Sequence, residues 1–265
     1  MGCNKICCNT VLKDSSQHYV TALALADPVE KKWWLFEATP DITAQLALFQ
    51  SKTNGEFPYL PEGIFLTHAH IGHYSGLMYL GREAMNTKNV SVYVLPKMKS
   101  FLESNGPWSQ LISLGNITPK LLSVNQALKL NHAISVEAFT VPHRDEFSET
   151  AGFKIHTTAK KYLFIPDIDK WAKWSRSIID EVKRVDIAFL DATFYSGDEL
   201  PDRDIRTVPH PLVTETLELF KNAKELSQKI HFIHLNHTNS LLWDKQKADL
   251  FQKSGYHIAL QATKL

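Results

Sequence analysis

Short runs of β-branched and aromatic residues recur along this chain, and a histidine or an aspartate lies at or just beyond the end of several of them. Runs of about four to eight such residues are typical of strands. The clearest ones cover residues 18–25, 33–38, 63–67, 90–95, 133–141, 152–158, 162–166, 186–190 and 230–235. Polar side chains at the end of a strand are held by a rigid scaffold. The pattern therefore predicts sheets that position a cluster of polar groups.

Segments with helical spacing lie between these runs. They cover residues 42–50, 74–85, 171–182, 213–226 and 242–252, and Asp41 is a candidate N-cap of the first. Many strands come early, and strands then alternate with helices, which indicates sheets covered by helices in the α/β class. No linker rich in glycine, serine or proline divides the chain, so we expect a single domain over residues 1–265.

The densest group of candidate metal ligands is FLTHAHIGHYSGL, residues 65–77. His68 and His70 are two residues apart and point the same way in an extended segment, so both can bind one ion. His73 follows where we expect the strand to turn into a helix, and its different direction suits a second, adjacent ion. Neutral imidazole binds zinc, iron and manganese. The cluster predicts a metal centre with one or two ions, most simply Zn²⁺, with iron or manganese as alternatives.

The overall charge excludes some partners. With 29 basic and 28 acidic residues, nothing indicates a nucleic-acid surface or a polybasic membrane patch. The chain has no apolar run of membrane-spanning length, and its N-terminus lacks the apolar core of a signal peptide. We expect a small-molecule substrate, no membrane, no nucleic acid and a cytoplasmic location. A longer N-terminus with an export signal would change the location, and a homodimer is left open.

The cysteines are confined to the N-terminal segment 1–15, as Cys3, Cys7 and Cys8. They cannot cross-link the rest of the chain, so the fold does not depend on disulfides. Ile6 stands where the N-myristoylation pattern requires serine or threonine, which argues against lipidation. A Cys-x3-Cys-Cys set is also one ligand short of a closed tetrahedral zinc site. We therefore favour an exposed N-terminal leader.

The order of the motifs resembles that of the metallo-β-lactamase-fold superfamily. THAHIGHYSGL is similar to its H-x-H-x-D-H motif, followed by Gly-Leu on the next helix. The later motifs are VPHRDEFSETAGF with His143, YLFIPDID with Asp167, and FIHLNHTN with His234 and His237. The resemblance extends from about Ala22 to Leu265 and implies an αββα sandwich, with two mixed sheets flanked by helices.

The resemblance also implies a ligand set. It assigns the first metal to His68, His70 and His143, and the second metal to His73, Asp167 and His234. Asp167 matches the carboxylate that bridges the two ions. His234 is preferred to His237 because it lies at the end of the final strand. Asp191 in FLDATF matches an acid that supports the site without binding metal.

Two positions depart from the superfamily pattern. Glu37 stands where an aspartate is usual, which is a mild change. Gly72 stands where the superfamily has the aspartate ligand of the second metal, so that site loses a carboxylate and some affinity. The first site keeps three imidazoles and an open position, an arrangement that lowers the pKa of a bound water. We expect an unequal or single-metal centre.

A further histidine, His210, indicates which branch of the superfamily the chain resembles. TVPHPLVTETLELF places His210 nineteen residues after Asp191, similar to the catalytic histidine segment of the tRNA 3′-processing endonucleases and cyclic-phosphate phosphodiesterases. That similarity implies a general acid, and the alternative is a structural hydrogen bond at a helix start.

The overall pattern more closely resembles the pyrroloquinoline quinone biosynthesis protein B-like family. The segments that carry this resemblance are WLFEATPDITAQL, GLMYLGRE, DIAFLDATFYSGDE and IHLNHTNSLL. Members of that family carry a cysteine-rich segment like residues 1–15, which gives some weight to a structural metal role for the cysteines after all. Their first strand precedes that segment, so we expect it to be missing here.

These features predict a metal-dependent hydrolase. A metal-bound hydroxide would attack a phosphodiester, ester or lactone, with His210 and Asp167 as catalytic residues and His210 protonating the leaving group. One alternative is an iron-dependent oxygenase or hydroxylase of the quinone-cofactor biosynthesis type. Another is a non-catalytic metal-binding domain, in which Gly72 marks a decayed site. The retained histidines favour the hydrolase.

Overall fold

The computed structural model describes residues 5–13, 18–201, 203–259 and 261–265. Contacts divide the chain into two compact units. Unit 1 comprises residues 1–18, 127–144 and 152–260, and unit 2 comprises residues 19–126, 145–151 and 261–265. The single domain expected over residues 1–265 stays a prediction.

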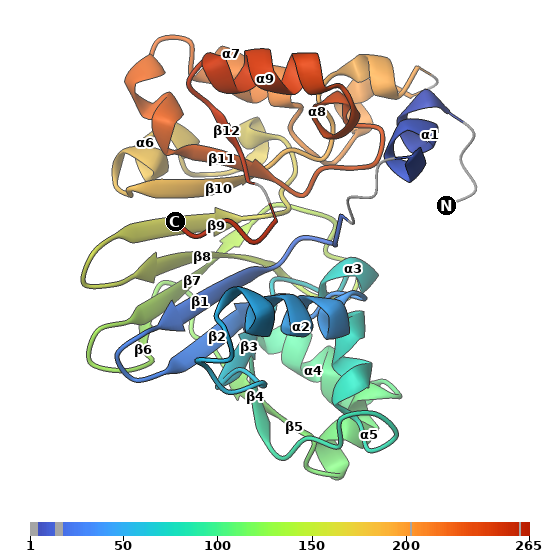
Figure 1. Ribbon diagram of the computed structural model, residues 1–265, viewed down its shortest axis with the longest axis vertical. Helices are drawn as coiled ribbons and strands as arrows, with labels where there is room; N and C mark the ends of the chain where they lie inside the picture. Colours follow the sequence, from blue (N-terminus) through green and yellow to red (C-terminus); the bar gives the residue numbers. More distant parts are fainter. Residues whose placement is uncertain (1–4, 14–17, 202, 260) are drawn as a thin grey trace. The chain divides into compact units, whose positions relative to one another are not determined.

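Unit 2 is built on a five-stranded mixed sheet in the order β1-β2-β3-β4-β5 (Figure 1). Its strands are β1 (Leu23–Asp27), β2 (Lys32–Phe36), β3 (Gly63–Phe65), β4 (Val90–Val94) and β5 (Ile117–Leu121). Only β1 and β2 pair antiparallel; the later pairs are parallel. The connections contain α2 (Ile42–Lys52), α3 (Ile71–Tyr74), the 3₁₀ helix η1 (Ser75–Leu80), α4 (Pro96–Ser104) and α5 (Trp108–Ser113). Because parallel pairing needs crossover connections, these helices cover the sheet and bury its side chains.

Unit 1 contains most of the seven-stranded mixed sheet β12-β11-β10-β9-β8-β7-β6. Its strands are β6 (Ala127–Lys129), β7 (Ser135–Val141), β8 (Thr150–His156), β9 (Lys161–Ile165), β10 (Ile187–Asp191), β11 (Ile230–Ile233) and β12 (His257–Ile258). The α-helices of this unit are α1 (Ile6–Lys13), α6 (Ile178–Lys183), α7 (Val213–Leu219), α8 (Ser240–Trp243) and α9 (Lys245–Lys253). The 3₁₀ helices are η2 (Trp171–Lys173), η3 (Gly197–Glu199), η4 (Ile205–Thr207) and η5 (Lys224–Lys229). Strands β9 to β12 run parallel, so the ends of β9, β10 and β11 lie at one edge of the sheet.

Each unit has its own apolar core. In unit 1, Phe139, Leu163 and Phe232 belong to a cluster of buried side chains, and in unit 2 Trp33 and Ile64 belong to another. Two mixed sheets flanked by helices confirm the predicted α/β class, and every strand-like run has a strand as its counterpart.

The helices differ from the prediction more than the strands do. The helix expected over residues 171–182 is broken, because Trp174 is extended and α6 starts only after Ser177, whose hydroxyl accepts a hydrogen bond from the Asp180 amide at 3.2 Å. Such a side-chain cap defines a new helix start. The helix expected over residues 74–85 ends at Leu80, and α4, α5, β5 and β6 had no strong local signal.

The N-terminal cysteines differ from the expected exposed leader. Cys7 lies on α1 and is buried, so the leader is not exposed at this residue. Cys3 lies outside the described residues. Helix α1 contacts α8, and both belong to unit 1.

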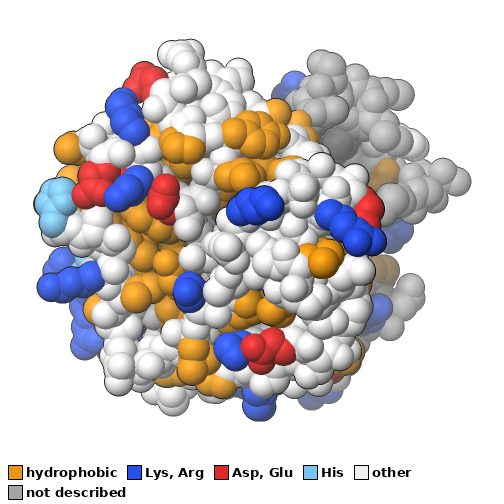
Figure 2. Space-filling model, turned by 90° about the horizontal axis from the view of Figure 1, so that it is seen from below, with side chains coloured by type: hydrophobic (Ala, Val, Ile, Leu, Met, Phe, Trp, Pro, Cys, Tyr) orange, Lys and Arg blue, Asp and Glu red, His pale blue; other side chains and the backbone are white. Residues whose placement is uncertain are grey.

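The surface carries mixed charges. On the face shown in Figure 2, lysines and arginines are interspersed with carboxylates and with hydrophobic side chains. This agrees with the near-neutral sequence. Among the helices in the described ranges, none is both long and apolar enough to cross a membrane.

Candidate metal centre

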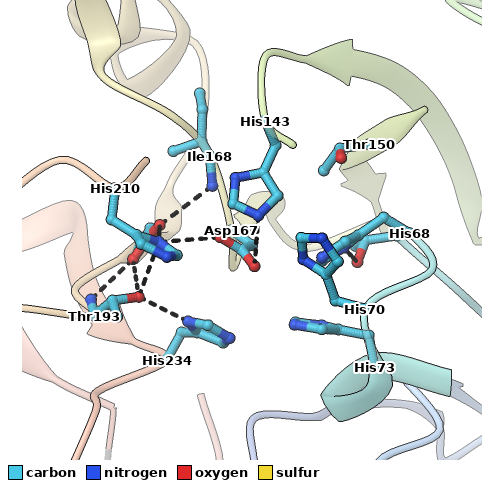
Figure 3. A network of polar contacts seen from close by, with 12 residues as sticks. His68, His70, His73, His143, Thr150, Asp167, Ile168, Thr193, His210 and His234 are labelled. Carbon is cyan, nitrogen blue, oxygen red and sulfur yellow. Dashed lines mark hydrogen bonds and ion pairs between the residues drawn. The ribbon is translucent and has the colours of Figure 1, made fainter. Parts of the chain in front are cut away.

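Unit 2 brings together the three histidines of the first motif. His68 and His70 follow β3, and α3 starts at Ile71, so His73 lies on the first turn of that helix (Figure 3). The ring centroid of His68 lies 4.4 Å from that of His70 and 4.2 Å from that of His73. His68 and His73 are buried, as expected for ligands at the end of a core strand.

Glu37 supports this group from the end of β2. Its side chain is fully buried, and its Oε1 accepts the hydroxyl hydrogen of Thr67 at 2.6 Å and lies 3.4 Å from Nδ1 of His73. The Thr67 hydroxyl is in turn 2.8 Å from Nδ1 of His68. Glu37 has a left-handed backbone with φ of 77°. Such a conformation is uncommon for residues other than glycine and persists where the surroundings enforce it. The glutamate thus contacts His73 directly and His68 through the Thr67 hydroxyl.

The segment 145–151 contacts His70 and the backbone around the same histidines within unit 2. Glu146 Oε2 lies 3.1 Å from Nε2 of His70, and the Ser148 hydroxyl accepts the Ala69 amide at 2.9 Å. The Ala151 amide donates to the Thr67 carbonyl at 3.0 Å. Glu146 is therefore a neighbour of a candidate ligand, which sequence spacing did not distinguish from a solvated loop.

Gly72 lies in α3, between two of the candidate ligands. A Cβ placed there would meet only Cγ1 of Val20, at 3.8 Å, among the described residues. Its backbone is not left-handed, so glycine is not required for conformational reasons. The position therefore has room for a Cβ.

Unit 1 brings together the remaining predicted site residues at the ends of its strands (Figure 3). Asp167 follows β9, Asp191 ends β10 and His234 follows β11. Nε2 of His143, beyond β7, lies 3.3 Å from Oδ2 of Asp167. Nδ1 of His210 lies 2.9 Å from Asp191 Oδ2 and 3.1 Å from Asp167 Oδ1. His210 thus contacts both acids.

His234 joins this cluster through Thr193. The Thr193 hydroxyl lies 2.9 Å from Nδ1 of His234, whose backbone is left-handed with φ of 61°. Asp191, His210 and His234 each offer one potential ligand atom, and these atoms lie within 4.8 Å of one another. His237 is exposed instead, and its Nδ1 lies 3.0 Å from Oδ1 of its neighbour Asn236.

The two acids control the charge of His210. Burial lowers the pKa of His210, but Asp191 and Asp167 outweigh that effect and raise the pKa to about 10 in the metal-free protein. The ring is therefore protonated at neutral pH. A protonated imidazole fixed between carboxylates can donate a hydrogen bond or a proton.

The donor chemistry fits a divalent metal. Unit 2 offers three clustered imidazoles, and unit 1 offers imidazoles beside the carboxylates of Asp167 and Asp191. Imidazole and carboxylate are the usual protein ligands of zinc and of non-haem iron. Sequence reasoning missed Thr67 and Thr193, which contact candidate ligands. Two sequence features could have identified them: Thr67 directly precedes a candidate ligand histidine, and Thr193 follows Asp191 by two residues.

Comparison with known proteins supports the assignment of the fold. A family model described as the beta-lactamase superfamily domain matches residues 32–235. Coenzyme PQQ synthesis protein B of Gluconobacter oxydans (strain 621H) is 25% identical over 258 residues, which cover 86% of this chain and 81% of that protein.

Solved structures show the same fold. Zn²⁺-bound PqqB from Methylobacterium extorquens superposes with a TM-score of 0.75 at 18% identity, covering 97% of this chain and 92% of that one. A diphosphatase from the PhnP family superposes with a TM-score of 0.70 at 18% identity, covering 100% of this chain and 90% of that one.

Proposed function

Because this chain belongs to the beta-lactamase superfamily, we propose that it is a metal-dependent hydrolase of phosphodiester, ester or lactone substrates. The membership itself, predicted from the motif order, is confirmed by the family model and by the similarity to PQQ synthesis protein B. A solved neighbour is a diphosphatase, which supports hydrolysis as the reaction class.

We assign the metal to the ligands that the motif order gives. They are His68, His70 and His143 for a first ion, and His73, Asp167 and His234 for a weaker second one. The motif order within the matched residues supports this set, as do the clustering of candidate ligands in each unit and the zinc bound by a solved relative. Zinc is the proposed ion. When bound, it would lower the pKa of a water and polarise the scissile group.

The observation that carries the proposal is the position of His210 beside Asp191 and Asp167. Asp191 is fully buried and accepts from Nδ1 of His210, which fixes the orientation of the ring. Phe194 packs edge-on against the same ring, with centroids 5.9 Å apart. The other nitrogen, Nε2, is then the one that can protonate a leaving oxygen. A general acid held in this way contributes about 10²- to 10⁴-fold to the rate.

Hydrolysis by metal-stripped protein reconstituted with Zn²⁺ tests the proposal. The substrates would be bis(p-nitrophenyl) phosphate, p-nitrophenyl acetate and an aliphatic lactone. We expect His68→Ala to abolish turnover and His210→Gln to lower kcat by about 10²-fold or more. His237→Gln is the matched control in the loop of His234 and keeps its activity. Unchanged activity in His68→Ala would refute the mechanism.

The second candidate is an iron-dependent oxygenase acting in cofactor biosynthesis. The similarity to PQQ synthesis protein B is the observation that favours it. It predicts that Fe²⁺, but not Zn²⁺, supports substrate-dependent oxygen consumption. Loss of both activities with every metal would leave a metal-binding domain without catalysis.

A further inference from the structure

Two threonines each lie between a buried carboxylate and a candidate ligand histidine. In unit 2, the Thr67 hydroxyl is 2.6 Å from Glu37 Oε1 and 2.8 Å from Nδ1 of His68. In unit 1, the Thr193 hydroxyl is 2.7 Å from Asp191 Oδ1 and 2.9 Å from Nδ1 of His234. The order of groups, carboxylate then hydroxyl then imidazole, is the same in both.

The single hydrogen of each hydroxyl decides the direction of these bonds. An ionised carboxylate only accepts hydrogen bonds, so the threonine must donate to the acid. Its oxygen can then only accept, which requires a hydrogen on Nδ1 of the facing histidine. Nδ1 of His210 also lies 3.1 Å from the Thr193 hydroxyl, but it is closer to Asp191 Oδ2, at 2.9 Å. We therefore assign the Nδ1 hydrogen of His210 to Asp191, which leaves the hydroxyl oxygen of Thr193 free to accept from Nδ1 of His234.

We propose that Thr67 and Thr193 are positioning residues that hold His68 and His234 in the Nδ1–H tautomer and thereby present Nε2 of each ring to the metal. The metal-binding part of this inference rests on the proposed function. The tautomers themselves are properties of the metal-free protein.

The surroundings hold both threonines rigidly. The Thr67 carbonyl accepts the Ala151 amide at 3.0 Å. The Thr193 amide donates to Asp191 Oδ1 at 2.8 Å, and its carbonyl accepts the Asn236 amide at 2.9 Å. A hydrogen bond from the ring to an oriented acceptor fixes the tautomer and raises the basicity of the ligating nitrogen.

A residue with left-handed backbone belongs to each set of three. In unit 2 it is the acid, Glu37, with φ of 77°, and in unit 1 it is the ligand, His234, with φ of 61°. Strained backbone of this kind persists where the surrounding contacts enforce it. The left-handed backbone therefore occurs at the acid that accepts from Thr67 and at the histidine that Thr193 positions.

Valine and serine substitutions test the effect of the hydroxyl group separately from the effect of side-chain shape. Thr67→Val and Thr193→Val remove the hydroxyl, whereas Thr67→Ser and Thr193→Ser retain it. Thr87→Val is the matched control in unit 2, because the buried Thr87 hydroxyl bonds the carbonyls of Leu80 and Asn116. Thr216→Val is the matched control in unit 1, where the buried Thr216 hydroxyl bonds Trp171 and the Leu212 carbonyl.

The first readout is histidine ¹⁵N–¹H NMR of the metal-free protein at a pH where both rings are neutral. In the wild type we expect His68 and His234 to show the Nδ1–H pattern. Each valine variant should shift its own histidine toward the Nε2–H tautomer, and the serine variants should not. The Nε2–H tautomer in the wild type would overturn the proposal even if no variant folded.

The second readout is Zn²⁺ affinity, measured by competition with a chromophoric chelator. We expect each valine variant at Thr67 and Thr193 to bind about 10- to 100-fold more weakly, and the serine variants to stay within about threefold of wild type. Wild-type affinity in both valine variants, or an equal loss in the Thr87 and Thr216 controls, would refute the proposal. If the wild type bound no metal, the proposed function would fail, while the NMR result would still decide the tautomers.

Discussion

Replacing Gly72 with aspartate tests whether this glycine weakens the second metal site. A Cβ at this position meets only Val20 Cγ1, at 3.8 Å, among the described residues, so the added Cβ causes no steric clash. Aspartate is about 0.3 kcal/mol more favourable than glycine within a helix, and an acid near a helix start gains about 0.3–1 kcal/mol. The variant should therefore be at least as stable as the wild type without metal.

The added carboxylate should act mainly on the second ion. A gain of about 10- to 100-fold in its affinity corresponds to about 1.4–2.8 kcal/mol. Calorimetric titration of metal-stripped protein with Zn²⁺ measures this directly. We expect one tight ion in the wild type and two in Gly72→Asp. Gly72→Ala is the control, because it gives the helix effect without a ligand. If Gly72→Asp bound the second ion no better than Gly72→Ala, Gly72 would not occupy a ligand position.

Three further predictions concern buried polar groups. Burial and the neighbouring His257 lower the pKa of His231 to about 4, so its contribution to stability is present above pH 6.5 and is lost as the pH falls toward 4. With allowance for solvent screening, the free energy of unfolding should fall by about 1–2 kcal/mol over this pH range, as measured by urea unfolding. His231→Phe should remove this pH dependence. An equal fall in the variant would contradict the assignment to His231. Glu37→Gln should lower the free energy of unfolding by about 1–3 kcal/mol and weaken zinc binding, because it alters the acceptor of the Thr67 hydroxyl; unchanged stability and affinity would argue against that role. Trp108 Nε1 is buried with no acceptor among the described residues, whereas Trp33 Nε1 donates to the Pro58 carbonyl at 2.8 Å. Trp108→Phe should therefore cost less stability in thermal unfolding than Trp33→Phe, by about 1 kcal/mol; equal costs would refute the comparison.

The strands were predictable from the sequence because their side chains carry a local signal. Residues 186–190 and 230–235 are mostly apolar, with isoleucine and phenylalanine in each run, and they overlap the buried strands β10 and β11. Helix α4 had no comparable signal. Its first amides, those of Lys97 and Met98, donate to the Glu149 carboxylate, about fifty residues further along the chain. A cap supplied from so far away cannot be read from local spacing.

In the candidate site, too, features with a local sequence signal were predictable and long-range contacts were not. Histidines and acids at strand ends were identifiable because their spacing resembles a known motif. The contacts that orient them were not, since the partner of Thr67 lies thirty residues away at Glu37, and the partner of Thr193 lies forty-one residues away at His234. A hydroxyl residue has many alternative roles in a sequence, and only the fold selects one of them.

The metal content of protein purified without added metal tests the central claim most directly. Elemental analysis would compare the wild type with His68→Ala and with His237→Gln. We expect about one zinc per chain in the wild type and in His237→Gln, and a large loss in His68→Ala. A wild type without metal, or a His68→Ala variant with the same zinc content, would contradict a metal-dependent hydrolase built on these histidines.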